Sequence, residues 1–243
     1  MDRIILGWKA EVGKEVLIEG PPLEALRFHG GRAGSLITLT DPAGNDFRGR
    51  ILHLSKTEAS VLIFEAFSSP TESSLEIILL QALPEKERME MIIQKATELG
   101  VSTILPFESE RSISLKERES KQKKAHRWQH IAVKAVQQSR RARVPYVGAY
   151  RPFQQALEDC GEDGLKILLW EKEGRNLKHV VRQHFAQRVY LMVGPEGGFT
   201  EAEVKLANEK GFIPVKLGQR ILRTETTAIT LIGILQYELG DLS

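Results

Sequence analysis

The chain has 243 residues, 42% hydrophobic and 27% charged, a composition typical of a soluble protein of one or two domains. It has no apolar run of the roughly 18 residues that a membrane-spanning helix needs, and its N-terminus lacks a signal-peptide pattern. The single cysteine, Cys160, excludes an internal disulfide and a cysteine-rich metal site. We therefore expect a cytoplasmic protein without membrane association or a metal centre.

The net charge of +2 hides an uneven distribution. Residues 116–143 hold ten Lys or Arg against two Glu, whereas the rest of the chain has 24 basic and 30 acidic residues. A basic segment in an otherwise acidic chain localises an anionic partner. We expect this segment to bind nucleic acid.

The first 69 residues are typical of β structure. Short segments rich in Ile, Leu, Val and Phe alternate with turn signals, and no ten-residue amphipathic helix stands out. The predicted strands are residues 4–8, 16–20, 35–41, 48–54 and 59–67. This spacing indicates a small β-barrel. The polar residues 68–74 are interpreted as a linker, so we expect domains at 1–70 and 71–243.

After the linker, strands alternate with helices. The predicted strands are residues 75–83, 101–107, 144–149, 166–170, 189–193 and 212–217. The predicted helices between them include residues 84–99, 117–139, 152–160 and 176–186. This alternation predicts an α/β fold with a mostly parallel sheet and helices on both faces.

A glycine-rich loop, residues 194–200 (GPEGGFT), follows the apolar strand at 189–193. Loops at the carboxyl ends of strands are where open α/β sheets place ligand sites. Gly197 and Gly198 permit positive φ angles and close approach of a ligand to the backbone. Thr200 is expected to cap the next helix in a capping box with Glu203. A simple turn explains all of this except the second glycine, so turn and ligand site remain equal alternatives.

A second loop, residues 217–227 (LGQRILRTETT), leads into a helix that is apolar on most faces. Polar groups that enter a buried helix need hydrogen-bond partners. One alternative is local: Thr224 or Thr226 caps the helix, and Arg223 pairs with Glu225. The other is that both loops form one ligand site.

These two loops resemble the C-terminal signature of the RsmE family. Members are SPOUT-class methyltransferases that use S-adenosylmethionine to modify ring nitrogen 3 of a uridine in small-subunit (16S) ribosomal RNA. Residues 88–101 (RMEMIIQKATELGV), 109–112 (SERS) and 141–145 are similar to further family segments. The resemblance covers most of the chain from about residue 75 onward. Before that point it rests on a Leu-Arg pair at 26–27, Gly34 and the Leu-x-Asp at 39–41.

The resemblance implies a trefoil-knotted α/β domain at 71–243, a PUA-like RNA-binding β-barrel at 1–70, and a homodimer. It also implies that S-adenosylmethionine lies among three loops, residues 169–171, 194–199 and 217–226. Apolar side chains beside glycine-lined backbone suit an adenine ring. The implied cofactor contacts are Leu169, Trp170, Gly194, Pro195, Gly197, Gly198, Leu217, Gly218, Ile221, Leu222, Thr224 and Thr226.

The implied chemistry needs a cation and a base. The imino proton of uridine titrates well above neutral pH, so the nitrogen is a poor nucleophile until that proton leaves. An arginine can stabilise the uridinate oxygens, and a carboxylate can accept the proton. Arg223 is the candidate for the first role, and Glu196 or Glu225 for the second.

The basic segment becomes the expected site for 16S ribosomal RNA and the small ribosomal subunit. The expected RNA contacts are Arg27, Lys124, Gln138, Arg140, Arg141 and Arg143. Trp128 can stack on a base or pack in the core, and core packing is favoured. Where family members often have Glu-Gln-x-Gly-Arg, residues 137–141 read QQSRR. The lost carboxylate keeps two alternatives open: a non-catalytic RNA-binding or ribosome-assembly factor, and a SPOUT methyltransferase for another RNA.

Overall fold

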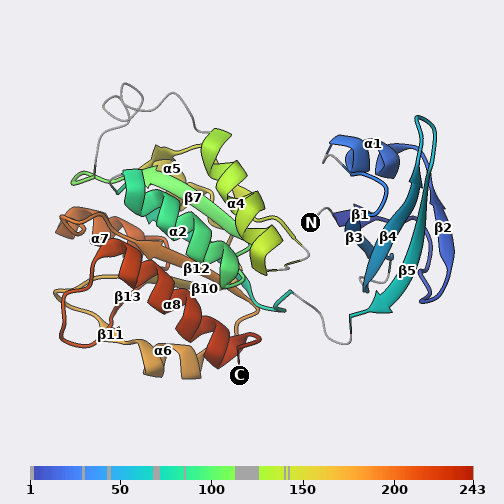
Figure 1. Ribbon diagram of the computed structural model, residues 1–243. Helices are drawn as coiled ribbons and strands as arrows, with labels where there is room; N and C mark the ends of the chain where they lie inside the picture. Colours follow the sequence, from blue (N-terminus) through green and yellow to red (C-terminus); the bar gives the residue numbers. More distant parts are fainter. Residues whose placement is uncertain are drawn as a thin grey trace. The chain divides into compact units, whose positions relative to one another are not determined.

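A computed structural model describes two compact units of the chain (Figure 1). One comprises Met1–Glu72 with Val136–Arg143, and the other Ser73–Ala135 with Val144–Ser243. Within the described ranges, no helix combines the length and apolar character needed to cross a membrane. The described residues are 3–28, 31–42, 45–67, 72–84, 86–112, 126–139, 141 and 143–242.

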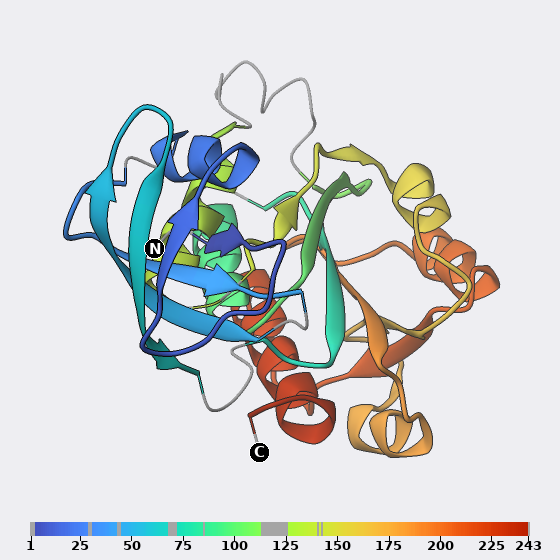
Figure 2. The ribbon, with the colours of Figure 1, turned by 90° about the vertical axis from the view of Figure 1, so that its right-hand side faces the viewer.

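The N-terminal unit contains one five-stranded, curled sheet in the order β1-β3-β4-β5-β2 (Figure 2). All neighbouring strands are antiparallel except β1 and β3, which are parallel. The five predicted strands therefore exist, each shorter than or close to its expected length. Their bounds are β1 (Arg3–Ile5), β2 (Glu15–Ile18), β3 (Leu36–Thr40), β4 (Asp46–Leu54) and β5 (Ala59–Ala66).

This unit also contains a helix that the sequence analysis missed, α1 (Pro21–Phe28). Two prolines open it, at positions where proline's missing N–H costs nothing. Leu23 and Leu26 are buried and pack in the same core as Ile37 and Ile51 of the sheet. The helix has eight residues, too few to show the repeated apolar spacing by which longer amphipathic helices are recognised.

The C-terminal unit is built on a parallel sheet in the order β11-β13-β10-β12-β6-β7-β8, with the short β9 beside β7. The helices of the described residues, separated in sequence by these strands, cover it (Figure 1). The strands are β6 (Glu76–Ala82), β7 (Thr103–Glu108), β8 (Tyr146–Val147), β9 (Arg151–Pro152), β10 (Leu165–Leu169), β11 (Arg175–Asn176), β12 (Arg188–Val193) and β13 (Ile213–Lys216). The helices are α2 (Lys86–Glu98), α4 (His126–Ser139), α5 (Phe153–Glu158), α6 (Leu177–Gln183), α7 (Glu201–Glu209) and α8 (Thr224–Leu239).

Successive residues of the central strands point to two separate cores. Ile77 of β6 packs in a core with residues of α2, α4, α6 and α8. Its neighbour Ile78 packs in a second core with residues of α5 and α7. Both faces of the sheet are therefore covered, which confirms the predicted α/β fold and explains why the central strands lack polar alternation.

Two predicted elements differ from the observed ones. The strand expected at 144–149 is reduced to the two residues of β8, at the edge of the sheet. A second two-residue strand, β9, follows after a break and also pairs with β7. Pro145 and Pro152 cannot donate backbone hydrogen bonds, which limits pairing there. The helix expected at 117–139 is observed as α4 from His126, and residues 117–125 lie outside the described residues, as do residues 68–71 of the expected linker.

Candidate functional site

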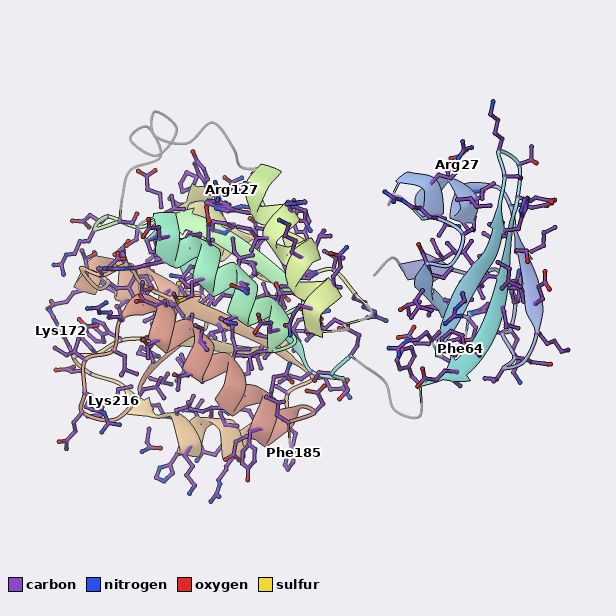
Figure 3. The ribbon with its side chains drawn as sticks, in the orientation of Figure 1. Arg27, Phe64, Arg127, Lys172, Phe185 and Lys216 are labelled. Atoms are coloured by element: carbon purple, nitrogen blue, oxygen red, sulfur yellow. The ribbon has the colours of Figure 1, made fainter. Side chains whose placement is uncertain are left out.

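A cavity of about 780 Å³ opens at the carboxyl ends of three adjacent strands, β12, β10 and β13. Its wall comes from the last residue of each strand and the loop after it, 169–172, 193–199 and 216–224, together with Arg88 and Thr227. Figure 3 shows the labelled Lys172 and Lys216, both lining residues, at the same edge of this unit. The parallel sheet thus brings together loops that lie far apart in the sequence.

The two adjacent glycines of the first loop are needed for different reasons. Gly198 has a φ of +69°, and a Cβ there would lie 2.8 Å from Oε1 of Glu171. Gly197 has an ordinary φ, but its Cβ would lie 3.0 Å from Cβ of Arg111. The first glycine gives Arg111 room and the second provides the turn, so the sequence GG is explained without reference to a ligand.

The loop is held in place by the helix that follows and by the SERS segment. Thr200 and Glu203 form the predicted capping box at the start of α7. Glu203 also accepts a hydrogen bond from the backbone N–H of Glu110 (3.0 Å). Arg111 next to it donates from Nη1 to the carbonyl of Gly197 (3.0 Å). The backbone of the glycine loop is therefore fixed before any ligand binds.

The two loops are joined by Thr224. Its hydroxyl donates to the carbonyl oxygen of Gly194 (2.7 Å) and accepts from Nε2 of Gln81 (3.0 Å), a fully buried side chain in β6. Helix α8 begins at Thr224, and its N-cap residue is Arg223, which makes no side-chain capping bond. The local alternative, with Thr224 or Thr226 as the N-cap, is therefore wrong.

Arg88, in the first turn of α2, lies between the two candidate bases. Its Nη1 donates to Oε1 of Glu196 at 2.7 Å, and its Nε lies 4.0 Å from Oε2 of Glu225. Glu225 thus faces Arg88, and the structure shows no ion pair between Glu225 and Arg223 among the described residues. Arg223 is exposed and lines the cavity. The sequence analysis missed the role of Arg88 because 108 residues separate it from Glu196.

Most of the predicted ligand residues line this cavity. The lining includes every implied cofactor residue except Thr226, which is exposed, and both Glu196 and Arg223, but not Glu225. Ile221 lines it with 89% of its surface exposed. The lining residues outside the predicted cofactor loops 169–171, 194–199 and 217–226 are Arg88, Lys172, Val193, Lys216 and Thr227.

The cavity fits a nucleoside-sized ligand with polar and apolar parts. Its volume lies in the range of small-molecule sites, and Leu169, Leu217 and Leu222 supply partly exposed apolar surface. The indole Nε1 of Trp170 is buried and finds no acceptor among the described residues. Such a donor needs a partner, and a bound ligand can supply one.

The basic segment is described only in part. Lys124 and Arg140 lie outside the described residues. Trp128 is buried, 4% exposed, with its ring 6.4 Å from that of Tyr150, which confirms core packing. Arg27, Gln138 and Arg143 are exposed, and Nη1 of Arg27 donates to the carbonyl of Lys56.

Arg141 is placed differently from the expectation for an RNA contact. Its Nη2 and Nε donate to the two carboxylate oxygens of Glu72, at 2.7 and 3.3 Å, and the side chains are 6% and 17% exposed. Glu72 also accepts from the backbone N–H of Arg143 (2.8 Å). The Arg141 guanidinium is thus paired and only slightly exposed, which does not favour the predicted phosphate contact in this conformation.

Comparisons with known proteins all find similarity to RNA methyltransferases. The model of an RNA methyltransferase domain family matches residues 71–236. Ribosomal RNA small subunit methyltransferase E of Bacillus subtilis is 30% identical, over 84% of this chain and 82% of its own length. That of Buchnera aphidicola from Acyrthosiphon pisum is 32% identical, over 80% and 76%. The crystal structure of the Neisseria gonorrhoeae enzyme bound to S-adenosylmethionine superposes with a TM-score of 0.76, at 34% identity over the whole of both chains.

Proposed function

The chain belongs to the RsmE family of ribosomal RNA small subunit methyltransferases, and we propose that it methylates ring nitrogen 3 of a uridine in small-subunit ribosomal RNA. It is an S-adenosylmethionine-dependent RNA methyltransferase. The observation that carries the proposal is the cavity in which Thr224 ties the second loop to the carbonyl of Gly194. This cavity is large enough for the cofactor, and it places Arg223 and Glu196 at the same edge of the sheet.

Within this proposal, the three loops hold the cofactor. Leu169, Leu217 and Leu222 flank the adenine, and the backbone from Gly194 to Gly198 lies along the polar parts. Glu171 is a carboxylate at the cavity wall that suits the ribose hydroxyls or the ammonium group. When bound, the cofactor supplies an electrophilic methyl group on a sulfonium centre.

The residues that handle the substrate are Glu196 and Arg223. Glu196 lines the cavity and Glu225 does not, so the geometry favours Glu196 as the proton acceptor. It takes the proton as the N3–H bond of the uridine breaks, and Arg223 stabilises the negative charge left on the ring oxygens. The nitrogen electron pair then bonds the methyl carbon, while the pair of the breaking carbon–sulfur bond stays on sulfur.

The RNA is held by residues distant from the cavity in sequence. We propose that the curled sheet of residues 1–70 is a PUA-like RNA-binding domain and that Arg27, Gln138 and Arg143, all exposed, contact the RNA. Lys124 and Arg140 complete the set of basic contacts. Because phosphate contacts release counterions, affinity for RNA should fall steeply with salt.

A trefoil knot and a homodimer are part of the same proposal. The knot is the arrangement that the family resemblance implies for the parallel sheet and for α8, the last helix of the described residues. Ile221 supports the dimer, since an aliphatic side chain 89% exposed at the rim of a cofactor cavity is the kind of surface that a second subunit covers. The dimer would act on ribosomal RNA in the cytoplasm.

The test is calorimetric titration of the purified protein with S-adenosylmethionine, followed by methyl transfer to small ribosomal subunits from a strain that lacks the gene. Binding together with transfer to a uridine supports the proposal. Absence of binding favours a non-catalytic assembly factor, whereas binding with transfer only to another RNA assigns a different substrate. Gln137 does not argue for the non-catalytic alternative, because it is exposed on α4 and is not among the residues that line the cavity.

A further inference from the structure

The cavity wall contains one cation that faces two carboxylates from two different elements. Arg88 lies in the first turn of α2, Glu196 on the glycine loop, and Glu225 in the first turn of α8. The side chains of the three are 28%, 34% and 13% exposed. Glu196 is exposed, whereas Arg88 and Glu225 are partly buried, so the cluster links three elements at the cavity and is anchored on its inner side.

The two contacts of Arg88 are unequal. At 2.7 Å its bond to Glu196 is a charge-assisted hydrogen bond, whereas 4.0 Å to Glu225 is beyond hydrogen-bond range. Oε2 of Glu225 is buried and accepts no hydrogen bond from any described residue. A buried carboxylate oxygen without a hydrogen bond lowers the stability of the fold. The cation that faces this oxygen is Arg88. Catalytic hydrogen bonds are often long before substrate binds and shorten in the reactive complex.

We propose that Arg88 is a positioning residue for proton transfer: Glu225 restrains it from one side, and it orients Glu196 from the other. The inference rests on the proposed function, in which Glu196 accepts the uridine N3 proton. Arg88 occupies Oε1 of Glu196 and leaves Oε2 to take that proton, while the N–H electron pair stays on the uridine ring. A base held by a third group is the general arrangement of activated catalytic sites.

This arrangement predicts that Arg88 and Glu225 act only through Glu196. Single-turnover methyl transfer is measured at saturating cofactor for Arg88→Gln, Glu225→Gln, Glu196→Gln and their double variants. We expect a rate loss of about 100-fold for Glu196→Gln and of about tenfold for each of the others near neutral pH. Adding Arg88→Gln or Glu225→Gln to Glu196→Gln should cause no further loss. Losses that multiply overturn the proposal.

The pH profile separates positioning from a structural role. As the pH approaches the pKa of uridine itself, the substrate loses its proton without Glu196, so the deficits of all three variants should shrink. Arg88→Lys keeps the charge but not the two-sided guanidinium and should recover only part of the rate. Deficits that stay constant with pH mean that Arg88 only supports the fold, which contradicts the inference.

A matched control is Arg188→Gln, which removes an arginine–glutamate pair with Glu76 at the opposite end of β12 from the glycine loop. It should transfer methyl at the wild-type rate. Glu225→Gln should bind S-adenosylmethionine within about twofold of wild type, because Glu225 does not line the cavity. Wild-type rates for both Arg88→Gln and Glu225→Gln refute this inference alone. A wild-type protein that binds the cofactor but leaves uridine unmodified refutes the proposed function and this inference with it.

Discussion

The Arg88 cluster and the Arg141–Glu72 pair are both built from arginine and glutamate, but they differ in burial and in hydrogen bonding. Arg141 meets a single carboxylate through two hydrogen bonds, and that carboxylate is completed by the backbone N–H of Arg143. Arg88 meets two carboxylates, and one of their oxygens is buried without a hydrogen bond from any residue that the structure describes. Among the residues that the structure describes, Arg141 and Glu72 form a mostly buried one-to-one pair, whereas Arg88 faces two carboxylates and borders a cavity.

The difference shows how a structural ion pair can be told from a functional one. A satisfied, buried pair holds a segment in place and has no acceptor left for chemistry. Arg88 lines the cavity and faces a buried acceptor that is still without a hydrogen bond from the described residues, so its contacts can change when a ligand binds. Basic character alone does not separate them, since Arg141 belongs to the basic segment and Arg88 does not.

Breaking the structural pair should produce the largest loss of stability. Arg141→Met leaves Glu72 buried beside an apolar side chain, and loss of one partner of a buried pair costs about 3–5 kcal/mol. Urea denaturation measures this loss, and the affinity for S-adenosylmethionine should not change. The double variant Arg141→Met/Glu72→Met should recover most of the stability, because no unpaired charge remains. An unchanged midpoint for the single variant would show that the pair is not structural.

The second largest effect is expected for the uncharged hydrogen bonds that the Thr224 hydroxyl makes at the cavity. Thr224→Val removes the hydroxyl that bridges Gly194 and Gln81, and should cost about 1–3 kcal/mol of stability because both partners lose a hydrogen bond. Cofactor affinity should fall by about tenfold, since 1.4 kcal/mol corresponds to one decade. Thr230→Val on the exposed face of α8 is the control and should change neither value. Equal effects of the two substitutions in calorimetry would mean that Thr224 does not join the loops.

A pair of glycines separates backbone strain from site disruption. Gly198→Ala and Gly13→Ala both place a Cβ at positive φ (69° and 87°), which costs about 1–2 kcal/mol each. Only at Gly198 does the new Cβ meet another residue, the carboxylate of Glu171 in the cavity wall. Both variants should melt earlier, but only Gly198→Ala should weaken cofactor binding. Weakened binding in Gly13→Ala would refute this assignment.

The smallest effect is expected for a solvent-exposed pair. The hydrogen bond and charge of Glu76 raise the pKa of Arg188, so this side chain stays protonated at every pH at which the protein is assayed. Exposed pairs contribute little, because water and salt screen them. Arg188→Ala should therefore leave the melting temperature unchanged between pH 6 and pH 9, about the range of ordinary assays. A clear drop in the melting temperature at every pH in this range would place Arg188 with the buried pairs.

Much of the fold follows from the order of apolar segments. Alternating strands and helices after residue 75 predict a parallel sheet, because only crossover connections can link such strands. Helix α1 could not be predicted from this order, since two buried leucines in eight residues are too weak a pattern. The shortness of β8 could not be predicted either, because it depends on an edge position that sequence periodicity does not reveal.

The candidate site divides in the same way. The glycine and threonine loops could be placed at one site because carboxyl ends of parallel strands meet at one edge of the sheet. The roles of Arg88 and Arg141 could not be predicted, because their carboxylate partners lie 108 and 69 residues away. A run of basic residues shows where charge is concentrated, but it does not show which side chains are already paired.

The central claim is that the cavity formed by the two loops holds a methyl donor for a uridine of small-subunit ribosomal RNA. It is tested most directly by incubating the protein and S-adenosylmethionine carrying a deuterated methyl group with small subunits from a strain that lacks the gene, then analysing the RNA nucleosides by mass spectrometry. We predict label in 3-methyluridine, and labelling at least about 100-fold slower when Thr224→Val/Glu196→Gln replaces the wild-type protein. Label in a different nucleoside, or no label with the wild-type protein, would contradict the account.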